Sequence, residues 1–234
     1  MLDLFSGEGG AGAGYHAAGW DVTGVDNSQT RLDSYPFATV KADAIEYALE
    51  HGHEFDAIHA SPTCTGYSRG TAALPDRFDR YDRLIGAVRE ALLEVGKPYV
   101  IENVEDALPE LRTPLLLCWS MFREPGSVID ADGTPLTMRR HRLFESNVML
   151  TAPGHCRHPR DVQVAGAYGG ARRNATEARE VRKGGYVPKS VDVLRDLIGA
   201  PWMGERGLFL SIPPAYTNHI GAQLMDAIAS ERVA

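Results

Sequence analysis

The chain has 234 residues, 44% of them hydrophobic, which is enough to bury one sizeable core, so we expect one main domain. It contains no apolar run of roughly 18 residues or more, and it opens without a basic region followed by an apolar segment. We therefore expect neither a membrane span nor a signal peptide, and we expect a cytoplasmic location. The net charge of -7 disfavours a protein that binds nucleic acid with its whole surface.

The charge is unevenly distributed along the chain. Residues 139–195 carry 12 Lys/Arg against 5 Asp/Glu, a net of +7, and the remainder carries 12 against 26, a net of -14. A protein that meets a polyanion with one face only would have such an asymmetry. On charge alone, a solvated surface rich in loops explains it equally well.

Short apolar runs alternate with helix-like stretches through the first half of the chain. The strands that we expect are residues 1–6, 21–26, 40–43, 55–60 and 99–104, and the expected helices are residues 11–20, 44–51 and 80–95. This alternation predicts an α/β fold of Rossmann-like type, with a parallel sheet, helices on both faces and ligands at the carboxyl ends of the strands.

The pattern loosens after Pro109. Asp130-Ala131-Asp132-Gly133 is a turn that we expect to join two hairpin strands. Residues 151–189 are rich in Gly, Arg, Pro and His without a clear period, which indicates a small irregular segment, and residues 222–232 are expected to form a helix that returns to the core. We therefore divide the chain into a catalytic and cofactor-binding part (1–150), a recognition segment (151–195) and a returning C-terminal segment (196–234).

A glycine-rich turn, residues 3–10, links the first expected strand to the first helix. Glycines let a ligand approach the backbone, and the helix N-terminus favours a negative group such as a carboxylate. Asp26 ends the second strand, where an acid can accept hydrogen bonds from ribose hydroxyls. Taken singly, such features are common in proteins of every sort.

The three cysteines, Cys64, Cys118 and Cys156, are odd in number and widely spaced, which fits a reducing compartment rather than a disulfide framework. Cys64 follows the fourth expected strand, over the ligand-binding edge of the sheet. A free thiol has a pKa of about 8.5, so a nearby cation or helix dipole is needed to raise its thiolate fraction. Considered alone, Cys64 would more often be a small buried hydrophobe.

Two further motifs place charge near the same edge. Glu102 sits at the end of the strand 99–104, and the segment 139–144 is expected to be a strand with Arg140 and Arg142 on one face. Alone, Glu102 could be a surface acid and the arginines a solvated edge. The order and content of the motifs together are much harder to reach by chance.

Together these motifs resemble the DNA cytosine-C5 methyltransferase family, most closely its short members of phage and actinobacterial type. The glycine turn, the cysteine loop 61–68, the Glu-Asn-Val strand and the Arg-x-Arg strand follow in that family's order, and residues 216–224 take the place of its last cofactor motif. The resemblance spans nearly the whole chain. It implies an S-adenosylmethionine-dependent methyltransferase fold with a small target-recognition segment.

The resemblance assigns a role to each catalytic candidate. Cys64 would add as a thiolate to carbon 6 of cytosine, which makes carbon 5 nucleophilic enough to take a methyl group from S-adenosylmethionine. Glu102 would hold or protonate N3, which requires a carboxyl group whose pKa burial has raised. Arg142 would contact O2, and Arg140 would help to position the base and the loop. Loss of the C5 proton and β-elimination would then release Cys64.

The resemblance also implies a cofactor site. Phe5 would stack on the adenine, and Asp43 would bond the adenine amino group. The residues expected to bind S-adenosylmethionine are Asp3, Phe5, Ser6, Gly7, Gly9, Gly10, Asp26, Asp43, Pro62 and Asn218.

Double-stranded DNA is the expected partner of a monomer that needs no other protein. A base inside a duplex cannot reach Cys64, so it must be flipped out at a cost on the order of a few kcal/mol. We expect a target of about two to four base pairs, since each arginine reads one guanine bidentately. The residues expected to contact DNA are Ser68, Arg172, Arg173, Arg182 and Lys183.

Four positions depart from the family pattern. Thr63 stands where the family has proline, Thr65 and Met138 stand where it has glutamine, and Thr217 stands where it has glycine. These departures bear on the rate, and on whether the transferred group is plain methyl, more than on the class of reaction.

A metal site is not expected. His155, Cys156 and His158 could ligate zinc, but no second Cys/His pair at zinc-finger spacing accompanies them.

Three other functions stay open. A transfer-RNA cytosine-C5 methyltransferase uses a similar cysteine loop and Glu-Asn-Val strand. An exocyclic amino methyltransferase is disfavoured, because it needs an aromatic residue where Thr63 and Cys64 stand. A catalytically silent DNA- or cofactor-binding protein is disfavoured by the retention of Cys64, Glu102 and Arg142 together.

Overall fold

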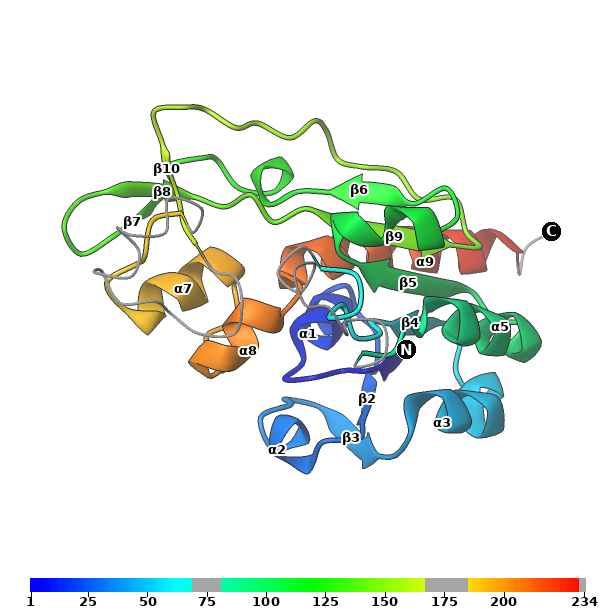
Figure 1. The fold of residues 1–234 in the computed structure, drawn as a ribbon. Coiled ribbons are helices and arrows are strands. Elements are labelled where there is room, and N and C mark those ends of the chain that lie inside the picture. Colours follow the sequence, from blue (N-terminus) through cyan, green and yellow to red (C-terminus); the bar gives the residue numbers. More distant parts are fainter. Residues whose placement is uncertain (69–80, 167–184, 232–234) are drawn as a thin grey trace.

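The computed structural model describes residues 1–68, 81–166 and 185–231. Its centre is a seven-stranded sheet of order β3-β2-β1-β4-β5-β9-β6, in which β9 alone runs antiparallel to its neighbours β5 and β6 (Figure 1). The predicted α/β fold of Rossmann-like type is confirmed. In chain order the elements are β1 (Leu2–Leu4), α1 (Gly10–Ala17), β2 (Thr23–Asp26), α2 (Gln29–Leu32), β3 (Ala38–Lys41), α3 (Ala44–His51), η1 (Gly52–Glu54), β4 (Ile58–Ala60), α5 (Ile85–Val95), β5 (Tyr99–Asn103), η3 (Glu105–Glu110), β6 (Leu115–Leu117), η4 (Trp119–Met121), β7 (Val128–Ile129), β8 (Pro135–Thr137), β9 (Arg142–Ser146), β10 (Gln163–Val164), α7 (Val191–Ile198), α8 (Glu205–Leu210) and α9 (Pro214–Glu231).

Helices cover both faces of the sheet. α3 and α5 pack together on one face, and α1 and α9 pack together on the other. The side chains of β5 alternate accordingly, because successive residues of a strand point to opposite faces: Tyr99 and Ile101 join the core under α3 and α5, whereas Val100 joins the core under α1 and α9. The central strands are buried on both faces, as parallel strands normally are.

The ends of the helices have clear local causes. Asp43 caps α3, because its side chain accepts hydrogen bonds from the backbone N–H groups of Ile45 and Glu46. α5 ends at Gly96, whose φ of 72° lies in the left-handed region that favours glycine. Residues 40–43 were expected to form the third strand, and the strand instead spans Ala38–Lys41 because Asp43 begins the capping of α3.

The Arg-x-Arg segment is a strand over a different range from the one expected. A strand over residues 139–144 was predicted, and β9 instead begins at Arg142 and ends at Ser146. Arg140 therefore precedes the strand, and the two arginines are not strand neighbours on one face. The reason lies in tertiary contacts, since the Arg140 guanidinium donates to the backbone carbonyl groups of Phe209 and Ser211.

A second, three-stranded sheet of order β10-β8-β7 lies beside α7 (Figure 1). β7 and β8 pair antiparallel and form the predicted hairpin, and Gly133 in its turn has a φ of 83°. Behind this sheet, Trp119 packs with residues of α7 and α8, and its Nε1 donates to the carbonyl of Leu197 at 2.6 Å. The small sheet thus has an apolar core of its own.

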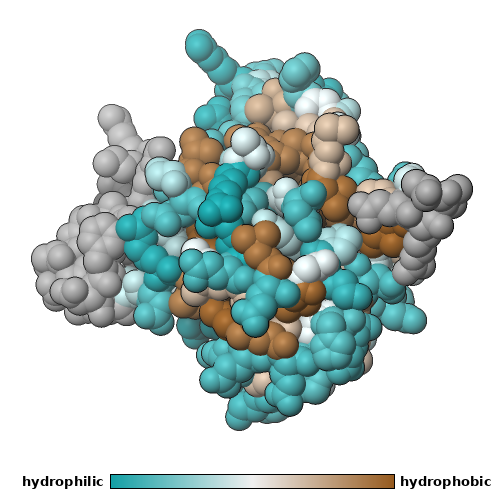
Figure 2. All heavy atoms as spheres, turned by 90° about the vertical axis from the view of Figure 1, so that its right-hand side faces the viewer, coloured by the Kyte–Doolittle hydropathy of each residue, from teal (hydrophilic) through white to brown (hydrophobic). Residues whose placement is uncertain are grey.

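α9 begins at Pro214, eight residues before the expected start of the C-terminal helix, and packs along α1. The Thr217 hydroxyl donates to the carbonyl of Ala11 at 2.8 Å, and Trp20 Nε1 donates to the carbonyl of Gly221 at 3.1 Å. No helix within the described ranges has the length and apolar character needed to cross a bilayer. On the side of the molecule that carries α5, apolar and hydrophilic side chains alternate over the surface (Figure 2).

A buried ion pair joins α5 to β9. Arg89 Nε and Nη2 lie 2.6 and 2.7 Å from the two carboxylate oxygens of Glu145, whose side chain is 2% exposed. Arg89 Nη2 also donates to the carbonyl of Glu110, and the backbone N–H of Arg112 donates to Glu145. The burial keeps this bidentate pair from being screened by solvent.

We expect Glu145→Ala to lower the free energy of unfolding by about 3 to 5 kcal/mol, because it leaves the Arg89 guanidinium buried without a counter-ion. Urea denaturation at neutral pH measures this loss. Glu124→Ala is the matched control, since Glu124 pairs with Arg157 at the surface and its loss should cost less than about 1 kcal/mol. Equal losses in the two variants would contradict the prediction.

Candidate functional site

The site lies at the carboxyl ends of the central strands. Leu4 is in register with Val25 of β2 and Ala60 of β4, and Ala60 is in register with Ile101 of β5. The next residue of each strand therefore reaches the same edge of the sheet. These residues are Phe5, Asp26, Ser61 and Glu102. The edge includes the point where the strand order reverses, between β1 and β4, which is where open α/β sheets bind ligands.

The glycine turn after β1 is built from residues in left-handed conformations. Gly7 and Gly9 have φ values of 57° and 88°, and Phe5 has a φ of 57° although it is not glycine. A left-handed aromatic residue costs on the order of 1 to 3 kcal/mol and is found most often at functional sites. Gly10, at the start of α1, packs so closely against the backbone of Ile212 that a side chain would clash there.

Asp26 fixes the turn from the neighbouring strand. Its two carboxylate oxygens accept hydrogen bonds from the backbone N–H of Gly7 at 3.1 Å and of Ser28 at 2.9 Å, and the residue is 3% exposed. Oδ2 also lies 3.5 Å from Nη1 of Arg31, and Oδ1 keeps a second lone pair. Asp26 is therefore both a support of the glycine turn and a candidate acceptor for ligand hydroxyl groups.

Beneath the turn, Asp3 and Ser6 carry polar atoms without partners. Asp3 Oδ2 accepts from the Tyr35 hydroxyl at 2.9 Å, whereas Asp3 Oδ1 and Ser6 Oγ are buried and have no hydrogen-bond partner. Burial raises the pKa of Asp3 to about 7, against the opposing effect of the Tyr35 hydrogen bond. Unpartnered buried atoms are costly in a resting protein, and a ligand that supplies hydrogen bonds would satisfy them.

The cysteine loop is tied to the next strand by the Glu-Asn-Val motif. Asn103 Nδ2 donates to the carbonyl of Pro62 at 3.0 Å, and the backbone N–H groups of Tyr67 and Ser68 donate to the carbonyl of Cys64. The side-chain amide of Asn103, the residue after Glu102, therefore holds the loop that carries Cys64. Cys64 is partly buried, and this burial raises the pKa of its thiol. The positive charge of Arg142 opposes the increase.

Glu102 and Arg142 form a buried ion pair. Arg142 Nε lies 2.9 Å from Glu102 Oε1, with the two side chains 13% and 7% exposed. Burial raises the pKa of the Glu102 carboxyl group, and the positive charge of Arg142 limits the increase. Both Glu102 and Arg142 influence the Cys64 thiol electrostatically, so the three catalytic candidates share one site.

A chain of hydrogen bonds behind Glu102 was not predicted from the sequence. The Tyr15 hydroxyl lies 2.9 Å from His59 Nδ1, His59 Nε2 lies 2.8 Å from Ser61 Oγ, and Ser61 hydrogen-bonds the Glu102 carboxylate. Burial lowers the pKa of His59 to about 3, so its ring is neutral and has one donor and one acceptor nitrogen. If Tyr15 donates to Nδ1, then Nε2 donates to Ser61, whose own proton points to Glu102. The only feature of the sequence that could have indicated this chain of hydrogen bonds is a histidine, His59, within an otherwise apolar expected strand.

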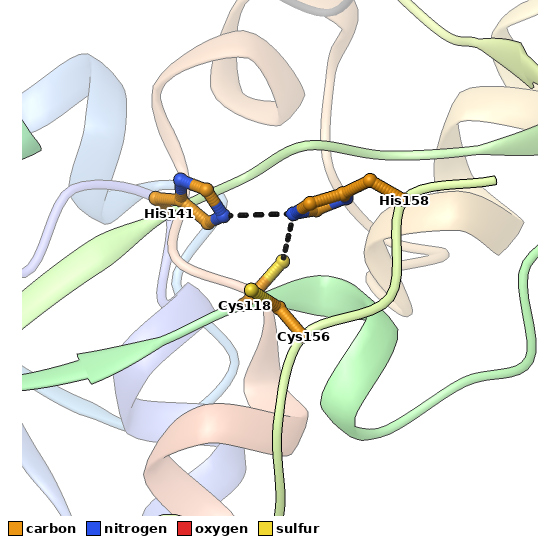
Figure 3. A group of neighbouring side chains, drawn as sticks. All are labelled: Cys118, His141, Cys156 and His158. Atoms are coloured by element: carbon orange, nitrogen blue, oxygen red, sulfur yellow. Dashed lines mark hydrogen bonds between the residues drawn. The ribbon is translucent and has the colours of Figure 1, made fainter. Parts of the chain in front are cut away.

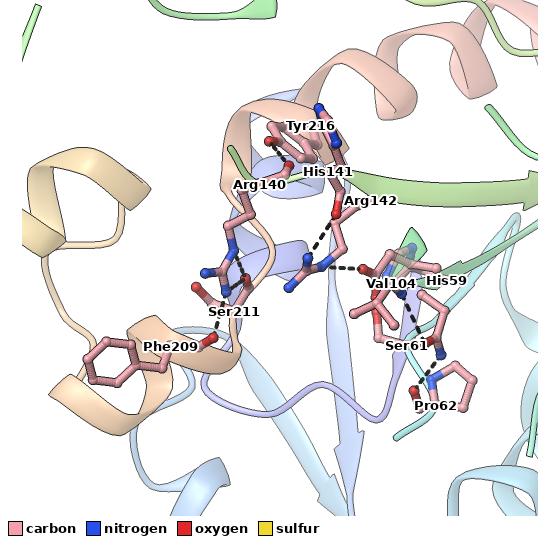
Figure 4. Close-up of polar contacts among 12 residues, drawn as sticks. His59, Ser61, Pro62, Val104, Arg140, His141, Arg142, Phe209, Ser211 and Tyr216 are labelled. Carbon is pink, nitrogen blue, oxygen red and sulfur yellow. Dashed lines mark hydrogen bonds and ion pairs between the residues drawn. The ribbon is translucent and has the colours of Figure 1, made fainter. Parts of the chain in front are cut away.

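Arg140 does not face the site in the way that was expected. Its side chain is completely buried, and its guanidinium donates to the carbonyl groups of Phe209 at 2.8 Å and Ser211 at 2.6 Å (Figure 4). These bonds fasten the segment between α8 and α9 to the chain just before β9. Arg140 therefore positions these segments, and its charge also lowers the pKa values of Cys64 and Glu102.

The other predicted residues are placed less centrally. Asp43 is exposed and its Oδ1 caps α3, and Asn218 is exposed on the second turn of α9. Ser68 ends the described part of the cysteine loop. Arg172, Arg173, Arg182 and Lys183 lie outside the described residues.

Two departures from the family pattern have a structural reason. Thr217 uses its hydroxyl to bond the carbonyl of Ala11 and so joins α9 to α1. Met138 is completely buried in the apolar core behind the small sheet, where a glutamine amide would lack hydrogen-bond partners. Thr63 and Thr65 bond each other through their hydroxyl oxygens at 3.3 Å within the cysteine loop.

The raised pKa of Asp3 predicts a pH-dependent gain of stability in Asp3→Asn. The folded state holds the Asp3 proton more tightly than the unfolded chain does, so ionisation of Asp3 costs stability as pH rises from 3.8 to about 7. Urea denaturation at about pH 4 and about pH 8 should give similar stabilities at the lower pH and a variant more stable by on the order of a few kcal/mol at the higher pH. A difference that does not change with pH would contradict the prediction.

Two solved structures share the overall fold of this chain. One is described as a DNA modification methyltransferase encoded within a prophage (E. coli); it has a TM-score of 0.60 at 15% sequence identity, over 97% of this chain and 99% of that one. The other is the Dnmt2 methyltransferase of S. pombe, with a TM-score of 0.59 at 12% identity, over 97% of this chain and 98% of that one. No family model and no curated protein matches the sequence. The likeness shows that this chain has the fold of these methyltransferases over almost its entire length.

Proposed function

We propose that this chain is a DNA cytosine-C5 methyltransferase that uses Cys64 as its nucleophile and S-adenosylmethionine as its methyl donor. The main support for this proposal is that Cys64, Glu102 and Arg142 lie together at the carboxyl edge of the sheet, next to the glycine turn. The two methyltransferases of the same fold support the reaction class. The target and the site residues rest on the geometry and on the motifs.

The cofactor would occupy the glycine turn. When bound, S-adenosylmethionine supplies an electrophilic sulfonium methyl group. Asp26 would accept from the ribose hydroxyls, and the unpartnered atoms of Asp3 and Ser6 fit the polar groups of a ligand at this position. Phe5 is half-buried beside the turn and offers an aromatic surface to the adenine.

Cys64 would form a bond from its Sγ to carbon 6 of the cytosine, and electron density would move to carbon 5. The thiol must give up its proton for this step, and its burial favours the neutral thiol in the resting site. The positive charges of Arg142 and, to a smaller extent, Arg140 oppose this effect and favour the thiolate, which is the form that attacks. Once carbon 5 carries the methyl group, its proton would be lost to water. The electrons of that C–H bond would re-form the C5–C6 double bond as the Sγ–C6 bond breaks and Cys64 leaves as the thiolate.

Glu102 would provide a proton to N3 of the ring as Cys64 adds. A carboxyl group can donate only while it is protonated, and burial favours that form of Glu102. Arg142 would contact O2 of the base while it holds the Glu102 carboxyl group in place, because its guanidinium has five donors and uses few of them on Glu102 and His141. The base must be flipped out of its duplex to reach these groups.

The first test is incubation of the purified protein with S-adenosylmethionine and either duplex DNA or transfer RNA, followed by mass spectrometry of the nucleosides. We expect 5-methylcytosine in the DNA, with its formation abolished in Cys64→Ala. 5-Methylcytosine in the transfer RNA alone would overturn the proposed substrate. No product on either substrate would overturn the proposed reaction.

Covalent trapping tests Cys64 more directly. In the presence of S-adenosylmethionine, we expect wild-type protein to form a stable complex with duplex DNA that contains 5-fluorocytosine. Once carbon 5 carries the methyl group, the fluorine there cannot leave as a proton does, so the elimination that releases the cysteine is blocked. Cys64→Ser should form none. His53→Ala is the control that should keep the complex, since His53 is exposed at the opposite edge of the sheet, before β4.

The hydrogen bond from Ser61 predicts a shift in the pH profile. This bond lowers the pKa of Glu102, so Ser61→Ala should raise that pKa further. The limb of the kcat/KM profile along which activity falls as Glu102 loses its proton should therefore move to higher pH. Thr63→Ala, an exposed change in the same loop, should leave this limb in place. A fall in activity that is equal at every pH would instead indicate that Ser61 is only structural.

A further inference from the structure

Four side chains with metal-binding atoms gather outside the proposed catalytic site. They are Cys118, His141, Cys156 and His158, and one ligand atom of each lies within 4.8 Å of the others (Figure 3). The residues come from three separate segments, namely the residue after β6, the residue before β9 and the segment between β9 and β10. Two thiols and two imidazoles from segments that are far apart in the sequence therefore lie close together.

Two of the distances within this cluster are close to those around a tetrahedral zinc ion. His141 Nε2 lies 3.1 Å from His158 Nε2, and Cys118 Sγ lies 3.8 Å from His158 Nε2. Zinc binds nitrogen at about 2.0 to 2.1 Å and sulfur at about 2.3 Å, so a regular tetrahedron separates two nitrogens by about 3.3 Å and a nitrogen from a sulfur by about 3.6 Å. The observed separations lie within a few tenths of an ångström of these values.

The surroundings of the cluster orient its members as metal ligands. His141 turns its other ring nitrogen, Nδ1, toward the Glu105 carboxylate at 2.9 Å, which is the carboxylate–histidine arrangement that commonly supports a metal-bound imidazole. Ser120 Oγ lies 3.4 Å from Cys118 Sγ and accepts from the backbone N–H of Arg157, the residue between Cys156 and His158. The two sides of the cluster are thus linked through Ser120.

We propose that Cys118, His141, Cys156 and His158 bind one structural zinc ion. Two sulfur and two nitrogen ligands in a tetrahedral arrangement favour zinc over magnesium or calcium, which prefer oxygen. The four protein ligands leave no open position for water or substrate, so the ion has a structural role. The ligands are too widely separated in sequence to match a zinc-finger pattern, and the fold alone brings Cys118 to Cys156.

The zinc ion connects the small sheet to the catalytic edge. His141 lies between Arg140 and Arg142, and its backbone carbonyl accepts from Arg142 Nη1 at 2.9 Å. Ligation of His141 therefore fixes the backbone that carries the arginine paired with Glu102. Ligation by Cys156 and His158 fastens the start of the segment that leads to β10. The ion therefore fixes the position of the segment before β10 relative to the start of β9.

Metal analysis of the purified full chain tests the site without any measurement of activity. After dialysis against zinc-free buffer, mass spectrometry of the elements should find about one zinc per wild-type chain. Cys156→Ala and His158→Ala should each lose most of it. His155→Ala is the matched control, because His155 is exposed next to Cys156 and lies outside the cluster, and it should keep the metal.

Cobalt gives an independent readout of the ligands. Cobalt added to metal-free wild-type protein should give the visible bands of a tetrahedral site and a thiolate charge-transfer band, and Cys156→Ala should weaken the charge-transfer band. Circular dichroism of each variant checks that it remains folded. Absence of zinc and cobalt from folded wild-type protein after reconstitution would overturn the proposal, as would undiminished binding in Cys156→Ala and His158→Ala.

Discussion

The ion pair between Glu102 and Arg142 depends on the reversal of one strand. β9 runs antiparallel between β5 and β6, so its first residue lies at the carboxyl end of β5, where Glu102 is located. Were β9 parallel to β5, its first residue would lie at the opposite edge of the sheet. The arginine that balances the Glu102 carboxylate, and that favours the Cys64 thiolate, is available because of this single antiparallel insertion. The polar chain from Tyr15 through His59 reaches the same carboxylate from the other side.

Much of the fold and part of the site could be predicted from the sequence, because both follow from local patterns. Apolar runs that end in glycine or an acid mark strands whose carboxyl ends carry ligands, and Phe5, Asp26 and Glu102 lie one residue beyond such runs or at their ends. The role of His59 could not be predicted, since its partners come from α1 and from the cysteine loop. The burial of Arg140 depends on carbonyl groups about seventy residues away, which no periodicity indicates.

The tertiary contacts explain residues that differ from the motifs of the family that the sequence resembles. Thr217 and Met138 stand at positions where this chain makes a helix contact and an apolar core, respectively. The cluster of Cys118, His141 and Cys156 could also not be predicted, because sequence spacing cannot show that the end of a strand and a distant segment lie side by side. Local sequence patterns therefore predicted the glycine turn and the strands beside it better than the part of the molecule that carries the small sheet.

The contact between α1 and α9 has a consequence for the order in which the protein is completed during synthesis. The bonds from Thr217 to Ala11 and from Trp20 to Gly221 join residues about two hundred positions apart, and Trp202 further donates to the carbonyl of Glu8 within the glycine turn. The ribosome makes α1 long before α9, so the first helix and the glycine turn stay uncovered until the last helix emerges. A nascent chain would complete its glycine turn late, and any truncation that removes α9 would expose the apolar face of α1.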